Sequence, residues 1–140
     1  TQMEEISAMS LRALLISLPL SLSLALALAF AVGGGGARAG EADVVAVKVT
    51  KTGDRVYRFD VTLRHDDTGW QHYADAWQVL GPDGAVLGTR TLVHPHVDEQ
   101  PFTRRLSGVR IPAGIAGVRL RARDKVHGHG GVEQDVPLPD

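Results

Sequence analysis

Arg55-Val56-Tyr57-Arg58-Phe59-Asp60-Val61-Thr62-Leu63-Arg64 is the stretch that decides the fold of this chain. From Tyr57 onward, apolar and polar side chains alternate along it without a break. The alternation places four apolar residues on one face: Tyr57, Phe59, Val61 and Leu63. Strict alternation is typical of a β-strand with one buried and one solvated face. The stretch therefore predicts a strand over residues 55–64 that covers a hydrophobic core.

Shorter segments with a similar alternation lie on both sides of this stretch. They predict six further strands, over residues 43–51, 73–80, 85–93, 102–111, 115–125 and 132–138. In the first of these, Val45, Val47 and Val49 are expected on one face, and Trp77 is expected in the core. The apolar pattern changes phase near Gly108, which predicts a β-bulge. Seven short strands with regular turn signals indicate an all-β, antiparallel β-sandwich.

One passage carries a family resemblance. Leu106-Ser107-Gly108-Val109 continues through Pro112 and Gly114 into Val118-Arg119-Leu120-Arg121-Ala122. The passage resembles the connection between the fifth and sixth strands of fibronectin type III domains, and Trp77 stands where immunoglobulin-like sandwiches keep a core aromatic residue. The tyrosine that the family has at the start of the sixth strand is missing, and Ala116 lies near that place. The resemblance implies a sandwich fold and no particular activity. In general appearance the chain is similar to small exported bacterial proteins of unknown function.

The first 39 residues differ in character from the rest of the chain. Ala13–Val32 is strongly apolar, and Ala37-Arg38-Ala39 has the A-x-A pattern of a signal-peptide cleavage site. The pattern predicts a leader and signal peptide over residues 1–39 and a single sandwich domain over residues 40–140, periplasmic or secreted. The mature chain would begin near Gly40. The alternative is an uncleaved anchor, because the apolar stretch is long enough to cross a bilayer.

Composition limits the classes of function. The chain has 15 Lys+Arg and 16 Asp+Glu, so its net charge is −1 at pH 7, and no nucleic-acid partner is expected. There is no cysteine, which leaves no thiol for a disulfide, a lipid anchor or a nucleophile. Ser107 is the only serine beyond residue 39, and the strand pattern places it away from the histidines. A serine or cysteine hydrolase is therefore not expected, whereas a metal-dependent enzyme stays open.

All six histidines fall in three segments between predicted strands: His65 and His72, His94 and His96, and His127 and His129. Successive connections in such a sandwich alternate between its two ends, so the three segments are expected to meet at one end. Neutral imidazole is a good ligand for Zn and Cu(II), and carboxylates can supplement it. The predicted mature chain lacks both cysteine and methionine, which argues against a Cu(I) site.

The candidate metal ligands are five histidines with three supporting carboxylates: His65, His72, His94, His96 and His127, with Asp67, Asp75 and Glu99. His65 continues the inward parity of its strand past the strand end. Asp75 shares the inward parity of Trp77, so it could orient a ligating imidazole or accept from loop amides. The sequence predicts an exported protein that binds Cu(II) or Zn for transport, buffering or delivery. Another exported or membrane protein could be its partner.

The alternative function is a binding module without a metal. The same loops would then recognise a protein or a small ligand, as sandwich loops often do. Under this hypothesis the histidines supply polar contacts or sensitivity to pH. The segment Asp66-Asp67-Thr68-Gly69 would form only a turn, since aspartate and glycine favour turns.

Overall fold

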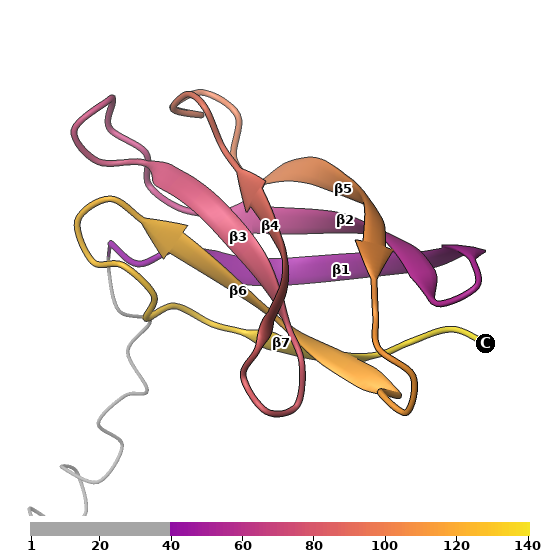
Figure 1. Cartoon of the computed structure of the whole chain (residues 1–140). Helices are drawn as coiled ribbons and strands as arrows, with labels where there is room; N and C mark the ends of the chain where they lie inside the picture. Colours follow the sequence, from indigo (N-terminus) through magenta and orange to yellow (C-terminus); the bar gives the residue numbers. More distant parts are fainter. Residues whose placement is uncertain (1–39) are drawn as a thin grey trace, which may run out of the picture. The chain divides into compact units, whose positions relative to one another are not determined.

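Seven strands make up the fold of residues 40–140, the part of the chain that the computed structural model describes (Figure 1). They are β1 (Asp43–Gly53), β2 (Val56–Arg64), β3 (Ala74–Leu80), β4 (Val86–Thr91), β5 (Phe102–Arg110), β6 (Gly117–Asp124) and β7 (Gln134–Pro137). Each corresponds to a predicted strand. The predicted signal peptide, residues 1–39, lies outside the described residues. Among the residues described, no helix is long and apolar enough to cross a membrane.

The strands form two antiparallel sheets, with the order β1-β2-β5 in one and β4-β3-β6-β7 in the other. The prediction of an all-β sandwich is therefore confirmed. In constant-type immunoglobulin domains the fourth strand belongs to the sheet of the first, second and fifth strands. Here β4 pairs with β3 instead, so the arrangement is an immunoglobulin-like sandwich with the fourth strand on the opposite sheet.

The core lies between the sheets and follows the alternation of β2. Its four inward residues are all buried, and Trp77 of β3 is buried against them, as predicted. Burying an aromatic or large aliphatic side chain contributes roughly 1.5–3 kcal/mol. Because both sheets supply such residues, residues 40–140 enclose a hydrophobic core of their own.

Bulges on the edge strands β1 and β5 change which residues face the core. On β5, Leu106 lies opposite Phe59 while Val109 lies opposite Tyr57, so the strand carries one extra residue there. Gly108 has φ +69°, which glycine adopts without steric cost, and the predicted bulge is confirmed. On β1, a second bulge between Val44 and Ala46 turns Val44 into the core.

The bulge on β1 overturns one prediction. Val45 is exposed, because the extra residue moves it off the face of Val47 and Val49. These two valines do pack against the core. A phase change of this kind cannot be recognised in the sequence, because the residues on both sides of it are similar β-branched residues.

The connections β2–β3, β4–β5 and β6–β7 lie at the same end of the sandwich (Figure 1). They comprise residues 65–73, 92–101 and 125–133. These loops contain all six histidines. We refer to these three loops as the histidine end.

Candidate metal centre

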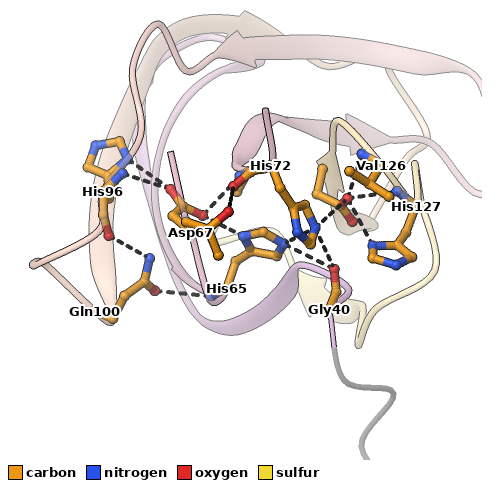
Figure 2. A network of polar contacts seen from close by, with 11 residues as sticks. Gly40, His65, Asp67, His72, His96, Gln100, Val126 and His127 are labelled. Carbon is orange, nitrogen blue, oxygen red and sulfur yellow. Dashed lines mark hydrogen bonds and ion pairs between the residues drawn. The ribbon is translucent and has the colours of Figure 1, made fainter. Parts of the chain in front are cut away.

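The three loops of the histidine end contact one another through polar groups. The backbone amide of His96 donates to Asp67 Oδ2 at 2.7 Å, which joins the β4–β5 loop to the β2–β3 loop. The imidazole rings of His72 and His127 lie 5.0 Å apart, which joins the β2–β3 loop to the β6–β7 loop. The alternation of connections predicts this meeting, and Figure 2 shows the resulting network.

Two imidazole nitrogens and a carboxylate lie together at the centre of the network. His65 Nε2 is 3.2 Å from His72 Nε2, and His72 Nε2 is 3.2 Å from Asp124 Oδ1. One ligand atom from each of the three residues lies within 4.8 Å of the others. The carbonyl oxygen of Gly40 is 3.0 Å from His65 Nε2 and 3.2 Å from His72 Nε2. Four potential donors therefore surround one point.

Asp67 determines the orientation and the tautomer of the His65 ring. Its carboxylate accepts from the amides of Ala74 and His96 and contacts His65 Nδ1. Both oxygens of Asp67 already accept from backbone amides, so the contact with His65 is assigned with Nδ1–H as the donor. In the neutral imidazole, Nε2 then keeps its lone pair directed at the centre. A carboxylate behind a histidine is the usual partner of a metal-ligating imidazole.

Asp124 is the functional candidate that sequence reasoning missed. It ends β6 and is buried, because it continues the inward parity of Val118, Leu120 and Ala122. The same parity argument that selected His65 on β2 would have selected Asp124 on β6.

The surroundings of Asp124 keep its carboxylate charged. Burial raises the pKa of Asp124, but the backbone amides of His127 and Val126 and the side chain of His127 donate to Oδ1 and outweigh burial. The pKa therefore lies below its ordinary value. Oδ2 is buried and has no hydrogen-bond partner among the described residues. A buried carboxylate oxygen without a donor requires a specific explanation, and a cation is one.

The spacing of the donors suits a small metal ion. With metal–ligand distances of 2.0–2.1 Å, neighbouring ligand atoms of a tetrahedral site lie about 3.3 Å apart. The four distances around the centre, between the imidazole nitrogens, Gly40 O and Asp124 Oδ1, are 3.0–3.2 Å. Small movements of the side chains would therefore complete such a site.

The other predicted histidine ligands lie around this centre. His127 Nδ1 is 3.1 Å from Asp124 Oδ1, so its ring borders the cluster. His96 is buried and stacks on Phe102 with ring centroids 3.9 Å apart. His94 is exposed, with its ring 4.6 Å from that of His96. His96 reaches the centre only through Asp67, whose Oδ2 accepts from its backbone amide and lies 3.9 Å from its Nδ1, and His94 contacts His96.

The two remaining carboxylates lie elsewhere. A bulge between Ala74 and Ala76 shifts the phase of β3, so the inward parity predicted for Asp75 is wrong, and its carboxylate lies 3.8 Å from the exposed Arg123. Glu99 is exposed and accepts from both terminal nitrogens of Arg104. Neither is within the group formed by His65, His72 and Asp124.

Comparison with known proteins gives one informative match. The chain is 45% identical over 91 residues to a protein of Halomicrobium mukohataei described as "Putative lipoprotein". The alignment covers 65% of this chain and 44% of that protein, so the chain spans less than half of its relative's length. No protein-family profile matches the chain. No solved structure matches it either.

The burial of His96 predicts a pH-dependent stability. Burial, and then the neighbouring charges of Arg104 and His94, hold the pKa of His96 below 6.5. As the pH falls below about 6.5, the unfolded chain takes up this proton before the folded one, so the free energy of unfolding decreases. We expect the His96→Phe variant, which keeps the stacked ring, to lose less stability between pH 7.5 and 5.5. Urea unfolding with a chelator present measures this, and an unchanged pH dependence would contradict it.

Proposed function

We propose that this protein is an exported, metal-binding protein of the cell envelope that holds Cu(II) or Zn at its histidine end. The observation that carries the proposal is the placement of His65 Nε2, His72 Nε2 and an Asp124 carboxylate oxygen around one point. The orientation of His65 by Asp67 supports it, since this contact directs the free lone pair to that point.

The chemistry of the four ligand atoms limits which metal ions the site would bind. Imidazole nitrogens, a carboxylate and a backbone carbonyl are borderline to hard ligands, which suit Zn and Cu(II) better than Cu(I). The three side chains supply three ligands and the Gly40 carbonyl a fourth, so exchange of the ion requires one of these four positions to open. Transport, buffering or delivery of the ion uses that opening for exchange with another exported or membrane protein.

Two observations support export. The A-x-A pattern at residues 37–39 follows an apolar stretch. The relative from Halomicrobium mukohataei is described as a lipoprotein, a class that is attached to the cell envelope. This chain has no cysteine, so attachment through a lipidated cysteine has no site within these 140 residues. We also propose that the domain is related to fibronectin type III domains, and the pairing of β4 with β3 supports this relationship.

Titration of the metal tests the proposal directly. We expect residues 40–140, purified without a His tag or a nickel column, to bind Cu(II) or Zn with a Kd below about 10 μM, near −7 kcal/mol. The His72→Ala variant should bind at least about tenfold more weakly, a loss of roughly 1.4 kcal/mol. His72 is only partly buried, so this variant should keep its fold.

The matched control is His129→Ala. His129 lies on the same loop as His127, but its Nδ1 contacts the carbonyl of Ala122 outside the cluster. Its removal should leave the affinity unchanged. Equal losses in the two variants would point to unspecific binding by exposed imidazoles, and no binding by the unaltered protein would overturn the proposal.

A second candidate function is recognition of another protein without a metal. Large apolar side chains are exposed on all three loops of the histidine end: Trp70 at 62%, Val93 at 73% and Val126 at 60%. A contiguous exposed apolar patch marks an interaction surface, and each of the three loops offers one large side chain to such a patch. Protein recovered from an exporting host with no bound metal, and with no affinity for Cu(II) or Zn, would favour this function.

A further inference from the structure

We infer that removal of the signal peptide completes the metal centre, because the freed α-amine of Gly40 becomes a ligand beside the imidazoles. This inference rests on the proposed function and adds a ligand to it. Its starting point is Gly40, whose carbonyl oxygen lies 3.0 Å from His65 Nε2 and 3.2 Å from His72 Nε2. The predicted first residue of the mature chain therefore touches both imidazoles, as Figure 2 shows.

The predicted cleavage site lies directly before this residue. Hydrolysis of the Ala39–Gly40 peptide bond by a signal peptidase adds one water, leaving a carboxylate on Ala39 and an amine on Gly40. Before cleavage, the Gly40 nitrogen is an amide and has no lone pair available for a metal. After cleavage it is an amine whose ordinary pKa is about 7.7–8.0, so a metal displaces its proton near neutral pH.

The amine is close enough to join the centre. From standard bond lengths, the nitrogen and the carbonyl oxygen of one residue are at most about 3.6 Å apart. Both atoms can bind one metal ion, because the nitrogen, the two carbons and the oxygen close a five-membered ring with it. The two imidazoles and the amine then supply three nitrogens, and the Asp124 carboxylate and the Gly40 carbonyl supply two oxygens. Cu(II) accepts such a set in a tetragonal arrangement.

The space around Gly40 fits this role. A Cβ atom at this position would lie 2.7 Å from Cε1 of His127, so a residue with a side chain would displace that ring. The chain therefore approaches the cluster closely only with glycine at position 40. Removing the signal peptide would also leave this end of the backbone free to turn its amine towards the imidazoles.

The test begins with the full chain exported by a host that removes signal peptides. Its intact mass should correspond to a first residue at Gly40, and a mature chain starting elsewhere would overturn the inference. Two matched proteins are then compared, one starting at Gly40 and one that keeps Ala39. They contain the same imidazoles, the same Asp124 and the same Gly40 carbonyl. They differ only in the residue that carries the α-amine, which is Gly40 in one and Ala39 in the other.

Cu(II) is the probe for both proteins. We expect the protein starting at Gly40 to bind Cu(II) at least about tenfold more tightly than the one that keeps Ala39, about 1.4 kcal/mol. Its electron paramagnetic resonance spectrum should change when the Gly40 nitrogen is labelled with ¹⁵N. Equal affinities and no isotope effect would overturn the inference while the metal centre stands. No Cu(II) binding by either protein would overturn this inference and, if Zn also fails to bind, the proposed function.

Discussion

The Asp67→Ala variant is expected to be less stable than the unaltered domain by about 3–5 kcal/mol, the typical cost of removing one partner from a buried charged network. Asp67 is buried and joins two loops. Its loss leaves the amides of Ala74 and His96 without an acceptor in the interior, and each such group costs roughly 1–3 kcal/mol. A domain of this size has a total stability of only about 5–15 kcal/mol.

Equilibrium unfolding in urea at pH 7 measures this loss. Asp66→Ala is the matched control, because Asp66 is the adjacent carboxylate and is exposed. A surface change of that kind usually shifts stability by less than about 0.5 kcal/mol. If Asp67→Ala were as stable as Asp66→Ala, the amide contacts of Asp67 would not hold the histidine end together.

The second large effect is stabilisation by the metal. At a free metal concentration of 100 times Kd, binding to the folded state adds about 2.7 kcal/mol to the free energy of unfolding. For a domain of about 100 residues this raises Tm by roughly 10–20 °C. We expect this rise with Cu(II) or Zn in the unaltered domain and none in the His65→Ala, His72→Ala double variant. Thermal unfolding followed by circular dichroism measures both.

Asp67→Asn separates ligand orientation from packing. An amide of the same size can offer its NH₂ group to His65 Nδ1, which favours the tautomer with the proton on Nε2. The metal-dependent rise in Tm should shrink, as outer-sphere changes usually lower metal affinity by about 10–100-fold. A full rise in this variant would show that Asp67 does not orient the ligand.

Much of the fold follows from local pattern. The alternation over residues 55–64 identifies a strand and its buried face, because successive side chains of a strand point to opposite sides. The phase change at Gly108 identifies the bulge, since glycine alone adopts φ +69° without cost. These features depend on neighbours in sequence, so they can be predicted without knowing what the strand packs against.

The bulges on β1 and β3 were not predictable in the same way. Val45 is exposed and Asp75 contacts Arg123 because β1 and β3 each contain one extra residue relative to the partner strand. The position of this register shift is set by pairing with residues far along the chain. A one-residue shift then reverses the face of every following side chain.

The sequence by itself determined the sandwich, the grouping of the histidines in three loops at one end, and the candidacy of His65 and His72. The tertiary structure alone decided that Asp124 and Gly40 join these two histidines, that Asp67 lies behind His65, and that His94 stays exposed. The physical reason is the separation in sequence between the residues that interact. Strand periodicity, a local property, fixes which face a side chain occupies. Contacts between polar atoms of separate loops depend on sheet register and loop conformation, which long-range packing sets.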